Sequence, residues 1–305
     1  MSRVGSLVVG VDVGGTNTDA AVLFSPASGA DPTALRDQLQ RWAAALAGSG
    51  RAEEAEELAA RLGEGTGGRG LVLGWTKRPT SGDVTAGVQD ALRSVLGDVW
   101  SPADVDAVLV GTTHFVNAIV QRSADLSPVA VLRLCGAASH ALPPFVSLPH
   151  DLATLIGTPR GHFHLAQGGL EIDGEQEIAA LDEAEIRGFA GTCIDKGLHV
   201  IVVCGVFSPV SAQQELAAVQ IVQGELERRL GKATARSFAV TPSHEVAHMG
   251  LLERESAAIL NACVQPLAQR TVRALRHAMG ELELTCPLFL VRPWPNPLPR
   301  HPLRN

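Results

Sequence analysis

Short apolar runs rich in valine alternate with stretches of helical periodicity along most of the chain, and this alternation constrains the fold more than any other feature. The first run, residues 7–13, is bounded by glycines and predicts a buried strand. Residues 20–24 follow after a turn and predict the second strand of a hairpin. Because later strands alternate with helices, we expect an α/β fold with a mixed central sheet flanked by helices.

Residues 25–70 interrupt this alternation. Apolar residues recur at helical spacing in two parts of the segment, and residues 63–70 are dense in glycine. We therefore predict an inserted helical hairpin closed by a flexible glycine linker. Residues 65–70 match GxGxxG by letter, but they follow a predicted helix and precede a strand, which is the wrong order for a dinucleotide loop.

Composition excludes several classes of protein. Apolar residues make up 46% of the 305 residues and charged residues 19%, so the chain can bury a large core and is not disordered throughout. The net charge of −7 and the absence of tyrosine argue against a nucleic-acid partner. The longest apolar run, residues 198–206, is too short to span a bilayer, and the five cysteines are dispersed. We expect a cytoplasmic protein without a membrane partner.

The first candidate binding segment is residues 12–19, DVGGTNTD, directly after the first predicted strand. Asp12 ends an apolar run, where a carboxylate needs a partner or a metal ion. Two glycines let a phosphate approach the backbone, and the next two residues add neutral donors. The segment predicts either a phosphate-binding turn or a plain hairpin turn capped by Asp and Thr. The candidate phosphate contacts are Gly14, Gly15, Thr16 and Asn17.

A second candidate lies at Gly111-Thr112-Thr113, between a predicted strand at 105–110 and a predicted helix at 115–122. Backbone N–H groups at the start of that helix can cradle an anion. The alternative is a tight turn in which threonine caps the helix.

The letters His244-Glu245-Val246-Ala247-His248 spell HExxH, the helical zinc-protease motif. No third ligand stands at either of the spacings that such enzymes use. We favour the start of a helix, with Thr241 as its N-cap and Pro242 at its first position, and a break near Pro266.

Six segments together carry a family resemblance. In chain order they are GVDVGGTNTDAAVL, WTKRPTSGDVTAGVQDAL, VLVGTTHFVNAIVQR, GGLEIDGEQEIAALDEAEI, VVCGVFSPVSAQQE and SHEVAHMGLLERESAAILNACVQPLAQR. They resemble the N-terminal half of the ATP-dependent hydantoinase/5-oxoprolinase family over most of residues 7–290, apart from the insertion. The resemblance implies a ribonuclease H-like, actin-like ATPase lobe.

The resemblance also implies a function, ATP-driven opening of a small cyclic amide such as 5-oxoproline or a hydantoin. ATP and Mg²⁺ would bind at the first motif, with Asp12 holding the metal through water. The second motif would contact nucleotide or substrate, and no catalytic residue is assigned. The implied site residues are Asp12, Gly14, Gly15, Thr16 and Asn17, with Gly111, Thr112, Thr113 and Asn117 from the second motif.

The same resemblance sets the expected domain organisation. Residues 1–240 would form the N-terminal-type lobe with the 25–70 insertion, residues 241–291 the truncated start of a second hydantoinase A-type region, and residues 292–305 a proline-rich tail. Family members continue into a second half with another DxGGT motif, so a second subunit or a homo-oligomer is expected to complete the site. The alternatives are a non-catalytic nucleotide-binding or interaction fragment, and a sugar kinase, whose opening motif is similar to DVGGTNTD.

Overall fold

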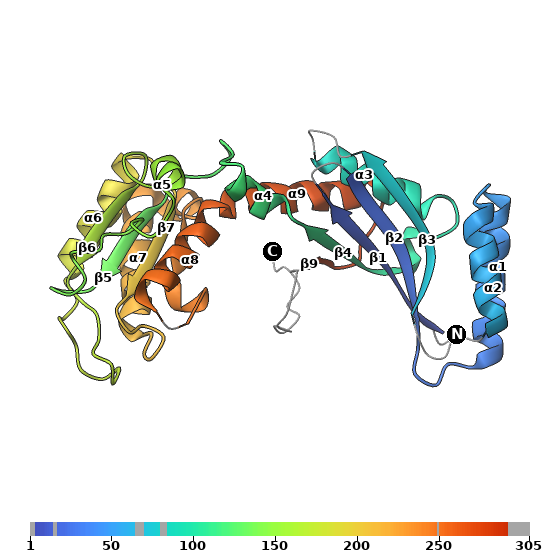
Figure 1. The fold of residues 1–305 in the computed structure, drawn as a ribbon, viewed down its shortest axis with the longest axis horizontal. Helices are drawn as coiled ribbons and strands as arrows, with labels where there is room; N and C mark the ends of the chain where they lie inside the picture. Colours follow the sequence, from blue (N-terminus) through green and yellow to red (C-terminus); the bar gives the residue numbers. More distant parts are fainter. Residues whose placement is uncertain (1–3, 15–16, 65–69, 80–83, 249, 292–305) are drawn as a thin grey trace. The chain divides into compact units, whose positions relative to one another are not determined.

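The computed structural model describes residues 4–14, 17–64, 70–79, 84–248 and 250–291. Contacts divide the chain into two compact units (Figure 1). The first unit comprises residues 1–117 and 270–305, and the second comprises residues 118–269. Each unit has its own sheet, so each is described separately.

The first unit contains a five-stranded sheet of order β3-β2-β1-β4-β9. The first three strands of the chain pair antiparallel, whereas β1 pairs parallel with β4 and β4 with β9. The mixed sheet predicted for a ribonuclease H-like, actin-like lobe is thus confirmed, and the structure adds its order, an antiparallel meander followed by parallel strands. The strands are β1 (Gly5–Val13), β2 (Asn17–Pro26), β3 (Leu71–Pro79), β4 (Val105–Thr112) and β9 (Leu288–Val291).

The core of the first unit lies on one face of this sheet. Leu7, Val9, Val11 and Val13 alternate along β1 and are all buried, because successive side chains of a strand point to opposite faces. They share one cluster with apolar residues of α3 (Val84–Leu96) and of the last turns of α9 (Gln265–Glu281). The intervening residues of β1, Asp12 among them, therefore lie on the opposite face.

The predicted helical insertion is confirmed as α1 (Pro32–Gly48) and α2 (Ala52–Glu64). The Asp31 carboxylate caps α1 by accepting hydrogen bonds from the backbone N–H groups of Thr33 and Ala34, at 3.1 and 3.4 Å. Leu39 and Leu58 are each 1% exposed and belong to the same core cluster as β1. The insertion is therefore packed into the first unit. Most of the predicted glycine linker of residues 63–70, namely residues 65–69, lies outside the described residues, and residues 63 and 64 belong to α2.

The second unit contains a parallel sheet of order β6-β5-β7-β8. Every residue of β5 and β7 is buried, as expected for parallel strands covered on both faces. A second sheet is not predicted from the sequence, because periodicity identifies strands but not their partners. The strands are β5 (Ala130–Leu134), β6 (His162–Ala166), β7 (Val200–Gly205) and β8 (Ala239–Pro242). The helices are α5 (His150–Ile156), α6 (Glu183–Asp195), α7 (Gln213–Ala235) and α8 (Leu251–Cys263).

The predicted helix start at Thr241-Pro242 is wrong. These residues end β8, where they pair with Val202 and Val203 of β7, and pairing with a buried strand overrides the local capping pattern. The helix α8 begins ten residues later at Leu251. The predicted break near Pro266 is confirmed, since α8 ends at Cys263 and α9 begins at Gln265.

The compact units do not coincide with the predicted boundary at residue 240. Helix α8 packs against β7, so residues 241–263 belong to the same compact unit as residues 118–240. The assignment of residues 1–240 and 241–291 to two family regions stays a prediction, and residues 292–305 lie outside the described part of the chain. Two helices, α4 (His114–Val120) and α9, cross the unit boundaries. Among the described residues, no helix combines the length and hydropathy needed to cross a membrane.

The packing of the insertion predicts the effect of truncating one of its core residues. Leu39→Ala should lower the free energy of unfolding by about 2–5 kcal/mol, because it removes a fully buried side chain. The matched control Gln40→Ala, at an exposed position of the same helix, should change it by about 0.5 kcal/mol or less. Urea denaturation measures both values, and equal small losses would show that the insertion is not part of the core.

Candidate functional site

A row of residues crosses the first unit's sheet on the face opposite the core. Asp12 is the centre of this row: its neighbours in register are Asp19 on β2 and Gly111 on β4. Beyond them, Asp19 is opposite Lys77 on β3, and Gly111 is opposite Val291 on β9. We call these five residues the cross-sheet row. It places two carboxylates and one ammonium side by side.

The cross-sheet row lines a hollow of about 610 Å³. This volume lies within the range of about 300–1,000 Å³ that is usual for ligand pockets. Most other lining residues are small or apolar, and the Trp75 side chain, 38% exposed, forms part of the wall. The hollow is therefore apolar along most of its length and charged where the row crosses it.

The charged part of the hollow suits a hard divalent cation. Asp12 is exposed, and Asp19 Oδ1 lies 3.3 Å from Lys77 Nζ. Within the described ranges, no three His, Cys, Asp or Glu side chains cluster in a way that could hold a metal. Mg²⁺ commonly takes only one or two protein carboxylates and completes its shell with water and phosphate oxygens. Asp12, with Asp19 beside it, fits such a cation.

The first predicted motif forms the turn between β1 and β2. The Gly14 N–H donates a hydrogen bond of 3.0 Å to the Asn17 carbonyl and closes this turn. A Cβ added at Gly14 would lie 2.9 Å from that same oxygen, so the turn requires glycine there. Gly15 and Thr16 lie outside the described residues, and their predicted contacts with phosphate stay a prediction.

The second predicted motif lies at the same end of the sheet. Val13 is opposite Thr112 in register, and the Thr112 hydroxyl donates to the Val13 carbonyl at 3.3 Å. Thr112 Oγ1 also accepts from the His114 N–H at 3.0 Å, and Asn117 Nδ2 donates to Thr113 Oγ1 at 3.3 Å. The two threonines thus stabilise the first turn of α4. The fold brings the two motifs together, as parallel strands bring their carboxyl ends to one edge.

Asp19 and Lys77 were not among the predicted site residues. A signal for Asp19 exists in the sequence, because Asp12 and Asp19 flank the short connection between the first two predicted strands and pair across it. Lys77 has no such signal. Its register with Asp19 depends on pairing across the 25–70 insertion and on an irregularity between Val22 and Leu23.

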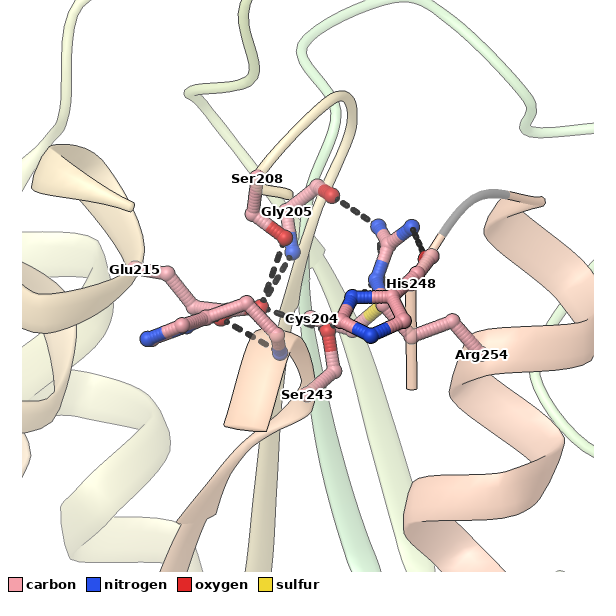
Figure 2. A network of polar contacts seen from close by, with 8 residues as sticks. Cys204, Gly205, Ser208, Glu215, Ser243, His248 and Arg254 are labelled. Carbon is pink, nitrogen blue, oxygen red and sulfur yellow. Dashed lines mark hydrogen bonds and ion pairs between the residues drawn. The ribbon is translucent and has the colours of Figure 1, made fainter. Parts of the chain in front are cut away.

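The second unit contains a separate buried network of polar groups (Figure 2). The Glu215 carboxylate on α7 is fully buried and accepts hydrogen bonds from the backbone N–H of Gly205 and the hydroxyls of Ser208 and Ser243, at 3.0, 3.1 and 2.6 Å. It also accepts from the backbone N–H of His244 at 3.0 Å and contacts His244 Nδ1. One carboxylate therefore ties the segments after β7 and β8 to α7.

Arg254 of α8 joins the same network. Its Nε donates to Ser243 Oγ at 2.9 Å, and its two Nη atoms donate to the carbonyls of His248 and Gly205 at 3.2 and 2.5 Å (Figure 2). The HExxH letters begin in a short 3₁₀ turn, Ser243–Glu245, and end before α8. His244 and His248 are thus not one turn apart on an α-helix, the arrangement that a zinc protease needs.

Four of the five cysteines are buried, and Cys286 is half-buried. All five are free, and burial raises the pKa of each. For Cys204, beside Arg254, burial raises the pKa to about 12. A thiol with such a pKa stays protonated near neutral pH and is a poor nucleophile.

A buried ion pair lies next to this network. Arg133 of β5 and Glu255 of α8 are linked by two hydrogen bonds, Nε to Oε1 at 2.8 Å and Nη2 to Oε2 at 2.5 Å. Their side chains are 0% and 3% exposed. Burial lowers the pKa of Arg133, but the hydrogen bonds and charge of Glu255 outweigh it, and the pKa is raised. Arg133 also donates to the Leu142 carbonyl at 2.6 Å, so its charge holds the loop after β5.

Breaking this ion pair should destabilise the second unit. Arg133→Met leaves Glu255 buried without its cation, and we expect a loss of about 3–5 kcal/mol in the free energy of unfolding. The matched control is Arg122→Met, which removes a solvent-accessible pair between the half-buried Arg122 and the exposed Asp151 and should cost about 1 kcal/mol or less. Chemical denaturation followed by circular dichroism separates the two, and similar small losses would contradict the structural role of Arg133.

Comparison with known proteins bears on both units. Residues 66–226, slightly more than half of the chain, match the family model described as the hydantoinase/oxoprolinase N-terminal region. A search of curated protein sequences gives no match. Among solved structures, the nucleotide-free structure of acetone carboxylase is similar with a TM-score of 0.59 and 16% identity, over 94% of this chain and 36% of that chain.

An ATP-dependent caprolactamase from Pseudomonas jessenii is also similar, with a TM-score of 0.52 and 19% identity over 93% of this chain and 35% of that chain. At these identities the similarity shows a shared fold. This chain spans about a third of the length of both structures.

Proposed function

Because the chain belongs to the hydantoinase/oxoprolinase family, we propose that it provides the phosphate-binding lobe of an ATP-dependent enzyme that opens a cyclic amide of the 5-oxoproline or hydantoin type. The family match supports the class of substrate. Two structures of the same fold belong to proteins described as an ATP-dependent carboxylating enzyme and an ATP-dependent caprolactamase, which supports the use of ATP.

The observation that carries the proposal is the register of β1. It sets Asp12 beside Gly111 and Val13 beside Thr112, so two chemically suited motifs meet at one end of one sheet. Asp12 would hold Mg²⁺ through water, and the turn after it would bind phosphate through backbone N–H groups. The residues proposed for nucleotide and metal are Asp12, Gly14, Gly15, Thr16 and Asn17, together with Gly111, Thr112, Thr113 and Asn117.

The chemistry of the proposed reaction assigns this chain a binding role. When bound, ATP supplies a phosphoryl group for the amide oxygen, which opens the ring carbon to attack by water. This chain's residues would hold the polyphosphate and its cation in a fixed orientation. Phosphoryl transfer is accelerated by groups placed around the phosphates on several sides. We therefore propose that a second subunit, or a second copy of the chain, completes the site.

Calorimetric titration with MgATP and MgADP tests the proposed site. The wild-type chain should bind with a dissociation constant in the micromolar range, and Asp12→Asn should weaken binding by about tenfold or more, equivalent to about 1.4 kcal/mol. The control Asp90→Asn removes an exposed carboxylate on α3 that pairs with Arg93 and should leave binding unchanged.

Two outcomes would contradict the proposal. A folded chain that binds no nucleotide would exclude a working phosphate site, and binding that is indifferent to Asp12→Asn would place the nucleotide elsewhere. Binding without ring opening of 5-oxoproline or hydantoin, even with a partner subunit, would instead favour a non-catalytic nucleotide-binding module.

A further inference from the structure

The pair formed by Asp19 and Lys77 has no evident structural task. Its Nζ–Oδ1 distance is 3.3 Å, and the two side chains are 49% and 65% exposed. Exposed ion pairs of this kind contribute about 0–1 kcal/mol to stability. The pair nevertheless lies in the cross-sheet row, next to Asp12, and both residues line the hollow.

Arg78, the next residue of β3, is also a cation but differs from Lys77 in its contacts. Arg78 follows Lys77 directly and points to the opposite face, where its Nη2 donates to Ser94 Oγ of α3 at 2.9 Å. The adjacent Thr76 hydroxyl also contacts Ser94 Oγ, at 3.1 Å. Thr76 and Arg78 thus form hydrogen bonds with α3, whereas Lys77 lines the hollow.

The spacing of the row sets what Lys77 can reach. Asp12 and Lys77 are two strands apart, or about 10 Å between their backbones. A lysine side chain is long and flexible, and its ammonium is a compact point charge suited to phosphate. A polyphosphate whose cation is held at Asp12 can therefore extend along the row to within reach of Lys77.

We propose that Lys77 is a phosphate-binding residue whose ammonium contacts the terminal phosphoryl group of bound MgATP, and that Asp19 is a positioning residue that holds this ammonium over the hollow. This inference rests on the proposed nucleotide site at Asp12. It assigns to β3 a role in distinguishing ATP from ADP, because ADP lacks the phosphoryl group that Lys77 contacts.

Titration of the full chain with MgATP and with MgADP tests the inference. Lys77→Met should weaken MgATP binding by about tenfold or more and MgADP binding by less than about threefold, since a charged hydrogen bond is lost with ATP alone. Lys77→Arg should restore most of the difference. The control Arg78→Met makes the same charge change on the same strand, on the opposite face, and should leave the ratio of the two affinities unchanged.

The variant Asp19→Asn tests the role of Asp19, because the direction of the change in MgATP affinity distinguishes repulsion from positioning. If Asp19 only repelled the polyphosphate, its neutralisation would strengthen MgATP binding. A positioning role predicts weaker binding instead, and predicts that the effect disappears when Lys77→Met is already present. Stronger binding, or an equal loss in the Lys77→Met background, would overturn the role of Asp19.

The results also separate this inference from the proposed function. Nucleotide binding that is lost in Asp12→Asn but unaffected by Lys77→Met would overturn the role of Lys77 alone. Absence of MgATP binding by the wild-type chain, or binding unaffected by Asp12→Asn, would overturn both. A loss that is equal for MgATP and MgADP in Lys77→Met would show that Lys77 does not contact the terminal phosphoryl group.

Discussion

The pairing of β1 with both of its neighbours is the constraint on which the candidate site depends. Antiparallel pairing with β2 sets Asp19 opposite Asp12, and parallel pairing with β4 sets Gly111 on the other side. Side chains alternate along a strand, so the valines of β1 must enter the core for Asp12 to face away from it. A shift of one residue would bury the carboxylate and expose the valines, at a large cost in free energy. Core packing therefore fixes the orientation of the site.

Much of the fold was predictable from periodicity. The valine-rich strands, the inserted helices of residues 25–70 and the mixed sheet all appear as expected, because burial imposes a period of two residues on strands and about 3.6 on helices. The second, parallel sheet was not predictable in this way. Its strands β5 and β7 are buried on both faces, so their sequences are nearly continuous apolar runs, and such runs indicate strands without indicating which strands pair.

The site was predictable in part for a similar reason. Asp12 and Gly111 could be predicted because a carboxylate and a glycine at the end of an apolar run are unusual. Lys77 could not, because only the register of β3 with β2 places it beside Asp19. In the segment 241–248, by contrast, the local sequence predicts a helix that the structure does not contain. Thr241-Pro242 has the letters of a helix start, but it ends a strand, and His244 and His248 contact Glu215 and Arg254 in a buried polar network. In this segment tertiary contacts determine the backbone conformation, and they override the helix propensity of the local sequence.

Paramagnetic relaxation with Mn²⁺ in place of Mg²⁺ shows whether the phosphate site lies on the cross-sheet row, because it locates the nucleotide-bound cation. With MnATP added to the isotope-labelled chain, we expect amide signals to broaden most around Asp12, Asp19 and Gly111, and much less around Gly5 and Ser25 at the far end of the same two strands. Broadening centred on the second unit, or none that depends on ATP, would contradict the assignment of the phosphate site to the cross-sheet row.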